Sequence, residues 1–100
     1  MSIVEISRRA KNDLFSIWEW GKERYGLDNA DAFIDDLNAT FEKIADIPYG
    51  YTARPELTET MRSKNFRKAY TIFYEPIDNG IRIVRVLRGS QDVERIVPNS

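Results

Sequence analysis

The chain has 100 residues, of which 42% are apolar and 12% aromatic, so a single domain with a packed core is expected over residues 1–100. It contains no cysteine, which excludes disulfides and thiolate chemistry, and no histidine, the commonest general base and non-thiol zinc ligand. We therefore expect no metal and no cofactor. No apolar run approaches the roughly 20 residues of a membrane-spanning helix, and nothing resembles a signal peptide, so a cytoplasmic protein without membrane contact is expected.

The net charge of −1 is unevenly divided along the chain. Residues 1–50 carry six Lys and Arg against ten Asp and Glu, whereas residues 51–100 carry nine against six. The basic residues are densest between Arg62 and Arg88. Such a field recruits an acidic partner or a phosphate backbone. The structural alternative is that solvated cations protect strand edges from aggregation.

The N-terminal quarter predicts a strand followed by a helix. Residues 2–7 read as a short strand, after which the Ser7 hydroxyl is suited to cap a helix. Apolar side chains then recur with helical spacing from Ala10 to Tyr25. Gly26 is expected to end this helix as the residue after its last turn.

A second helix and a polar strand follow. Asp28 is the expected N-cap of a helix whose apolar face runs from Ala30 to Ile44, so the short break before it implies an antiparallel helical hairpin. Residues Pro48 to Thr60 are expected to form a loop that Leu57 anchors to the core. Met61 to Arg67 is mostly polar, which is typical of an edge strand.

Two runs rich in β-branched and aromatic residues, Ala69 to Ile77 and Ile81 to Arg88, flank Asp78-Asn79-Gly80. Asn-Gly is a strong hairpin signal, because a type I′ turn needs positive φ at both central residues. Pro76 lacks an N–H group and belongs near a strand end or on an edge.

The last strand is apolar on both faces, which indicates a central position in the sheet. Strict alternation groups Ile81, Ile83 and Leu87 with Arg85 on one face. The same alternation groups Val84 and Val86 with Arg82 and Arg88 on the other. Two helices cover only one face, so apolar residues on the open face need a partner or a curled sheet.

The predicted element order is β-α-α-β-β-β, an α+β fold with an antiparallel sheet packed against an antiparallel two-helix hairpin. A short helical tail is expected over Asp92 to Val97, with Ser90 as its cap.

The aromatic side chains admit two interpretations. Tyr70, Phe73 and Tyr74 on a central strand are either a base-stacking platform or core, and core is the more common outcome. Trp18 and Trp20 are two positions apart on a helix, so one is expected in the core and the other exposed or contacting a partner.

Taken together, these motifs resemble the ParE/RelE superfamily of bacterial toxins, and its ParE branch more closely. The resemblance covers nearly the whole chain and depends on the order and spacing of several short motifs. These are Asp28-Asn29-Ala30, Phe33 to Leu37, Ile47-Pro48-Tyr49-Gly50, Arg54-Pro55-Glu56-Leu57, Tyr70-Thr71-Ile72-Phe73-Tyr74, and Gly80 to Gly89 with Asp92 beyond.

The resemblance implies the toxin of a type II toxin–antitoxin system, held inactive by a cognate ParD-like antitoxin in a hetero-oligomer. ParE-like members act on DNA gyrase, whereas RelE-like members cut messenger RNA on the ribosome without a metal. A third possibility is a folded interaction module that has lost toxicity.

Departures from the family patterns favour the gyrase interpretation. Nuclease members commonly carry Arg where this chain has Thr71 and another Arg after the last strand, where Gly89-Ser90-Gln91 stands here. They also tend to have His or Tyr in the tail, where this chain has Ile96-Val97. ParE-like members often have His at the position of Arg88, a change whose consequence the sequence leaves open. Asp35 and Asp36 resemble a carboxylate pair but are expected on a solvated helix face.

Two sets of site residues are predicted, with no catalytic residue and no metal ligand. The expected contacts with the target are Arg82, Arg85, Arg88 and Asp92, together with the C-terminal run from Gly89 to Val97. The expected contacts with the antitoxin are Trp18, Tyr70, Val84 and Val86.

Overall fold

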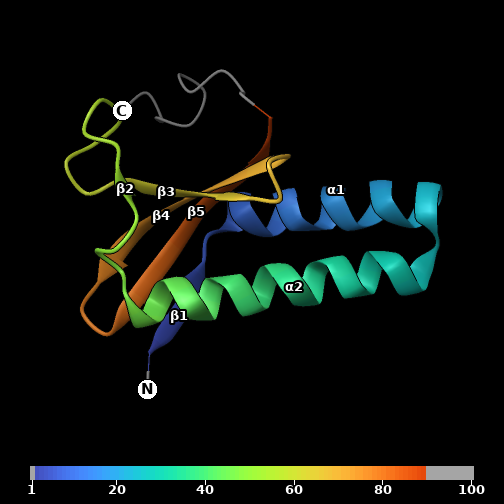
Figure 1. Cartoon of the computed structure of the whole chain (residues 1–100), viewed down its shortest axis with the longest axis horizontal. Helices are drawn as coiled ribbons and strands as arrows, with labels where there is room; N and C mark the ends of the chain where they lie inside the picture. The colour runs from blue at the N-terminus through green and yellow to red at the C-terminus, as the bar shows by residue number, and fades with distance from the viewer. Residues whose placement is uncertain (1, 90–100) are drawn as a thin grey trace.

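The computed structural model describes residues 2–89, and it has the α+β architecture expected from the sequence (Figure 1). Two helices form an antiparallel hairpin against a sheet of strand order β1-β5-β4-β3-β2, and the hairpin extends well beyond the sheet on one side. The elements are β1 (Ile3–Ile6), α1 (Arg8–Tyr25), α2 (Leu27–Asp46), β2 (Thr52–Ala53), β3 (Arg62–Phe66), β4 (Tyr70–Ile77) and β5 (Gly80–Arg88). The expected helix at Asp92 to Val97 and its Ser90 cap lie outside the described residues.

The predicted element order is confirmed, with one addition inside the expected loop. The two-residue strand β2 pairs with the start of β3, so β3 is only partly an edge. Within residues 2–89, neither helix combines the length and apolar character that a bilayer span requires.

The helix boundaries follow from two caps. The Ser7 hydroxyl accepts a hydrogen bond from the Ala10 N–H (3.0 Å), as predicted. Gly26, at φ 91°, follows α1 and donates its N–H to the Lys22 carbonyl (3.0 Å). The predicted N-cap at Asp28 is wrong, because the break between the helices is one residue long and Gly26 itself precedes α2. Asp28 lies in the first turn instead, where its charge complements the helix dipole.

The main core lies between the helices and the sheet. Its buried side chains include Leu37, Phe41, Ile44, Tyr70, Ile72, Tyr74, Ile81, Ile83 and Val86. Tyr70 and Tyr74 belong to this cluster and Phe73 is buried on the opposite face, so the core interpretation of the aromatic strand is confirmed. Trp18 and Trp20 are both half-buried and neither belongs to this core cluster, so the prediction that one of them lies in the core is wrong.

The second face of the sheet is covered by a loop. The chain between β2 and β3 folds back through hydrogen bonds from Arg54 N–H to the Met61 carbonyl (2.8 Å) and from Leu57 N–H to the Arg54 carbonyl (2.9 Å). Met61 and Leu57 then pack against Phe73, which is only 3% exposed. The expected anchoring by Leu57 is confirmed, and the expectation that nothing covers this face is wrong at this end of the sheet.

The β4–β5 hairpin forms where predicted but with a different turn. Ile77 pairs with Gly80, so the loop is Asp78-Asn79, and none of these residues has a positive φ. The predicted type I′ turn is therefore wrong. Gly80 is required for another reason, since a Cβ atom there would lie 1.8 Å from the carbonyl oxygen of Ile3. Pro76 is next to the end of β4, beyond the residues that pair with β3, as expected.

The direction of β1 also departs from the prediction of an antiparallel sheet. It runs parallel to β5, in a register from Ile3 opposite Gly80 to Ile6 opposite Ile83. This pairing makes β5 an interior strand, as its apolar character predicted, because β1 covers one side and β4 the other.

A β-bulge in β5 overturns the predicted division of its faces. Tyr74 pairs with Ile83 and Phe73 with Arg85, which leaves Val84 without a partner on β4. The alternation of side chains shifts by one position at this point. Ile81, Ile83 and Val86 consequently pack in the main core, whereas Val84 and Leu87 pack against Phe73 on the opposite face.

Candidate functional site

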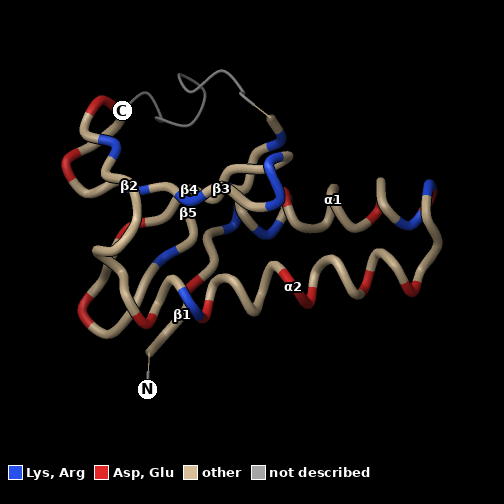
Figure 2. The backbone as a smooth tube through the Cα atoms, in the orientation of Figure 1, with Lys and Arg blue, Asp and Glu red and all other residues tan. Residues whose placement is uncertain are grey.

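A pocket of about 640 Å³ opens where the helical hairpin extends past the end of the sheet. Its walls come from both helices, the β3–β4 turn and the ends of β4 and β5. The lining residues are Ile17, Trp20, Gly21, Tyr25, Asn29, Ala30, Ala32, Phe33, Asp36, Arg67, Ala69, Tyr70 and Arg88. Figure 2 shows acidic residues distributed along α2 and basic residues gathered around the strands and their turns. Arg67 and Arg88 contribute the positive charge of the pocket.

The β3–β4 turn brings Arg67 to the pocket in a strained conformation. Arg67 (φ 51°) and Lys68 (φ 60°) both adopt the left-handed region, which favours Gly and Asn. The Arg67 guanidinium lies 5.0 Å from the Phe33 ring and forms an ion pair with the exposed Asp36 carboxylate. The turn therefore holds one cation over an aromatic wall of the pocket.

Arg88 reaches the pocket from the opposite side, at the end of β5. Its guanidinium lies 4.4 Å from the centre of the Trp20 ring, and that of Arg24 lies 4.7 Å from the same ring. Within residues 2–89, no carboxylate forms an ion pair with Arg88. Its charge is therefore held in position by a cation–π contact and remains available to an anionic group.

These features fit a particular class of ligand. Trp20, Tyr25, Phe33 and Tyr70 offer apolar area, and Arg88 offers a positioned donor. Aromatic and arginine side chains are the groups that most often carry affinity at protein interfaces. The pocket suits an amphipathic peptide segment that presents an apolar side chain beside a carboxylate.

The predicted target-binding arginines do not converge. Arg82 is exposed and pairs with Glu5 on β1 (3.2 Å), whereas Arg88 lies in the pocket. Arg85 lies between them and is held by Asp13 of α1 through two hydrogen bonds of 2.8 and 2.9 Å. Asp92, the fourth predicted contact, lies outside the described residues.

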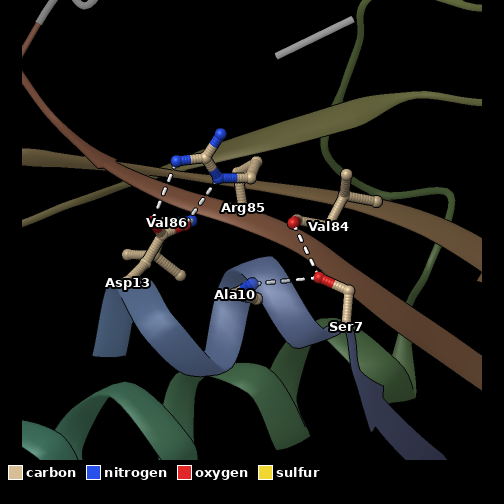
Figure 3. A network of polar contacts seen from close by, with 6 residues as sticks. All are labelled: Ser7, Ala10, Asp13, Val84, Arg85 and Val86. Atoms are coloured by element: carbon tan, nitrogen blue, oxygen red, sulfur yellow. Dashed lines mark hydrogen bonds and ion pairs between the residues drawn. The ribbon is translucent and has the colours of Figure 1, made fainter. Parts of the chain in front are cut away.

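A polar network joins the bulge of β5 to the start of α1 (Figure 3). The Asp13 carboxylate also accepts a hydrogen bond from the Val86 N–H (3.0 Å), and the Ser7 hydroxyl donates to the Val84 carbonyl (2.9 Å). The hydrogen bond to Asp13 raises the pKa of Arg85 above its already high ordinary value. Arg85 is thus a half-buried, paired residue and not a free surface cation.

The predicted antitoxin contacts lie in four different places. Tyr70 lines the pocket, and Val86 is 2% exposed inside the main core, so it offers no surface to a partner. Val84 lies on the opposite face of the sheet beside Leu87. Trp18 is half-buried on α1, where its indole N–H donates to Asp31 (2.8 Å).

The sequence interpretation missed most of the pocket, namely Trp20, Phe33 and Arg67. Phe33 lies within the predicted apolar face from Ala30 to Ile44, but the pocket forms where the hairpin extends past the sheet. The three-residue loop Arg67-Lys68-Ala69 between β3 and β4 was the available signal, because it places residues other than Gly or Asn in a tight turn.

Comparison with known proteins identifies the family. Residues 4–93 match the family described as the ParE toxin of the type II toxin–antitoxin system parDE. The chain belongs to the ParE toxin family. Toxin ParE1 of Caulobacter vibrioides is 34% identical over 95 residues, covering 92% of this chain and 94% of that protein. Toxin ParE1 of Mycobacterium tuberculosis is 31% identical over 91 residues, covering 90% and 92%.

The fold of this ParE-family toxin is also found among solved structures. A chain described as "Chromosomal ParDE TA system from P. aeruginosa" superposes with a TM-score of 0.75, covering 90% of this chain and 98% of that one. At 19% identity the likeness supports the fold alone. The family assignment itself confirms the resemblance drawn from the motifs, and it identifies the chain as the toxin of a ParDE-type system.

Proposed function

We propose that this ParE-family toxin acts in the cytoplasm by binding and poisoning DNA gyrase, and that it does no chemistry of its own. The observation that carries the proposal is the match of residues 4–93 to the ParE family. Gyrase passes through a state in which DNA is cleaved and covalently attached. A ligand that binds this state better than the resealed state raises its population, within the limit of that differential affinity.

Features of the described residues support binding over RNA cleavage. Thr71, at the position where nuclease members carry Arg, offers only a hydroxyl, which is hydrogen-bonded to Asn65 (3.3 Å). Burial raises the pKa of Tyr74 to about 12, and its hydroxyl donates to the Pro48 carbonyl (2.7 Å), so it is unsuited to act as a general base. Cleavage would need a base and a phosphate-stabilising cation close together.

We further propose that a cognate ParD-like antitoxin neutralises the toxin by occupying the pocket. The apolar walls around Trp20 and Tyr70, with Arg88 at their margin, match an amphipathic acidic segment. Such a segment would be disordered alone and would fold on binding. The complex would be a toxin–antitoxin hetero-oligomer.

The gyrase contact is proposed to lie at the C-terminal end, in the run from Gly89 to Val97 that includes Asp92. Arg88 adjoins this run, whereas Arg82 and Arg85 lie further back along β5. An overlap at Arg88 between the two contacts would explain how an antitoxin in the pocket prevents action on the target.

A paired assay tests this function. Purified toxin is incubated with gyrase, ATP and supercoiled plasmid, and linear DNA is scored after protein denaturation, beside a translating extract scored for messenger cleavage. We expect linear DNA to accumulate only with gyrase present and the messenger to remain intact. A variant lacking Asp92 to Ser100 should lose the accumulation of cleaved DNA while it still binds the antitoxin.

The opposite pattern would reject the proposal. Specific messenger cuts with gyrase unaffected would establish the RelE-type endoribonuclease function instead. Inactivity in both assays, with antitoxin binding intact, would identify an interaction module that has lost its toxicity.

A further inference from the structure

The side of the sheet on which Arg88 lies is decided by the bulge at Val84. Counted by strict alternation from Ile83, which faces the helices, Leu87 would face the helices and Arg88 would face away. One extra residue in the strand moves every later side chain to the opposite face of the sheet. With Val84 unpaired, Leu87 packs on the far face and Arg88 contacts Trp20 of α1.

The bulge is held by side chains of the segment around the start of α1. Asp13 accepts hydrogen bonds from the Val86 N–H (3.0 Å) and from the Arg85 guanidinium (2.8 and 2.9 Å). Ser7 donates to the Val84 carbonyl (2.9 Å). These contacts serve backbone groups on both sides of the irregularity, as Figure 3 shows. In a regular strand, neither the Val86 N–H group nor the Val84 carbonyl would lie in the same place.

We propose that Asp13 is a positioning residue that keeps the bulge in place and thereby sets Arg88 on the helix side of the sheet. The inference deepens the proposed function and rests on it, because the pocket margin that Arg88 forms is the proposed antitoxin contact. Asp13 itself touches no partner in this scheme. It acts through the backbone of β5, by stabilising the bulged register against the regular one.

The proposal differs from a role in stability alone, because it predicts rescue by a deletion. Removing Val84 leaves Tyr74 opposite Ile83 and Phe73 opposite Arg85, now in a regular ladder. Alternation from Ile83 then sets Arg88 on the helix side without any bulge. Asp13 should be dispensable for the position of Arg88 in that background, whereas a residue that only stabilises the fold would still be needed.

The test uses four purified full-length proteins: wild type, Asp13→Ala, the Val84 deletion, and both changes together. Nuclear magnetic resonance reports nuclear Overhauser contacts between the Arg88 side chain and the Trp20 ring, and the ring-current shift of the Arg88 protons. We expect the contacts and the shift in the wild type and in both deletion proteins, and their loss in Asp13→Ala. A fifth protein, Glu5→Ala, is the matched control, because it breaks an exposed ion pair to Arg82, which lies on β5 like Arg88.

Two results would overturn the inference. One is a folded Asp13→Ala protein that keeps the Arg88–Trp20 contacts. The other is a folded double variant that lacks them although the Val84 deletion alone retains them. If Asp13→Ala does not fold, the inference requires that the double variant fold and keep the Arg88–Trp20 contacts. A double variant that also fails to fold, while the Val84 deletion alone folds, would overturn it.

Antitoxin binding, measured by calorimetry on the same proteins, separates this inference from the proposed function. Loss of the hydrogen bond from a correctly placed Arg88 to an anionic group of the antitoxin corresponds to about tenfold weaker binding. We expect that loss in Asp13→Ala and its recovery in the double variant. If Arg88 moves as predicted while the affinity for the antitoxin is unchanged, the proposed antitoxin contact is wrong and the positioning role of Asp13 stands.

Discussion

Replacing Lys68 by Gly should stabilise the toxin, although the change removes a whole side chain. Lys68 has φ 60° in the β3–β4 turn, next to Arg67 at φ 51°. An L-residue in this region is disfavoured by about 1–2 kcal/mol relative to its preferred conformations. Gly adopts the region freely but loses about 0.5–1 kcal/mol more in backbone entropy on folding. The difference leaves a net stabilisation of about 0.5–1 kcal/mol.

Thermal and urea unfolding measure this change directly. For a domain of this size, 1 kcal/mol corresponds to a shift of about 4–8 °C in the melting temperature. Lys68→Gly should therefore melt about 3–6 °C higher than the wild type. Lys68→Ala is the matched control, because it removes the same charge and methylene groups but keeps a Cβ atom in the left-handed region. It should not raise the melting temperature.

The result that would refute this reasoning is an equal or lower melting temperature for Lys68→Gly. An equal rise in Lys68→Ala and Lys68→Gly would refute it differently, by assigning the effect to charge and not to backbone strain. Arg67 is left unchanged in both variants because its ion pair with Asp36 and its contact with Phe33 would confuse the comparison.

Two further predictions follow from the ionisable side chains. Arg85→Ala should destabilise the fold by about 3 kcal/mol, because it leaves the largely buried Asp13 carboxylate without its partner. Arg82→Ala should cost less than about 1 kcal/mol, because its ion pair with Glu5 is exposed, and urea unfolding of both variants measures the difference. Burial raises the pKa of Tyr74 to about 12, above the value near 10 of an unfolded tyrosine, so the unfolded state loses this proton first. The contribution of this pKa shift to the free energy of unfolding, about 3 kcal/mol, is therefore present below pH 10 and lost as the pH rises to 12. Tyr74→Phe should show a smaller fall in stability over this pH range, and an equal fall would contradict the assignment.

Local patterns in the sequence were sufficient to predict the helices and most of the strands. The helical spacing of apolar residues from Ala10 to Ile44, together with the helix-end signals at Ser7 and Gly26, was sufficient to predict the helical hairpin. These signals act within one or two turns of chain. The β4–β5 hairpin could be predicted in the same way, because only two residues of the chain separate the two paired strands. The family resemblance followed from the order of such local motifs, and the comparisons confirm it.

The division of the faces of β5, and the pocket to which it contributes, depend on contacts between distant segments of the chain. The Val84 bulge is held by Asp13 and Ser7, more than 70 residues away in the chain, and no local pattern records such contacts. The parallel direction of β1 likewise depends on a long-range pairing with β5. The backbone of β1 can approach β5 at Gly80 because this residue has no side chain. The consequence for the site is large, because a shift of one residue moves Val86 into the core and Arg88 onto Trp20. Alternation is a rule of the regular strand, and one extra residue in the ladder is enough to reverse it.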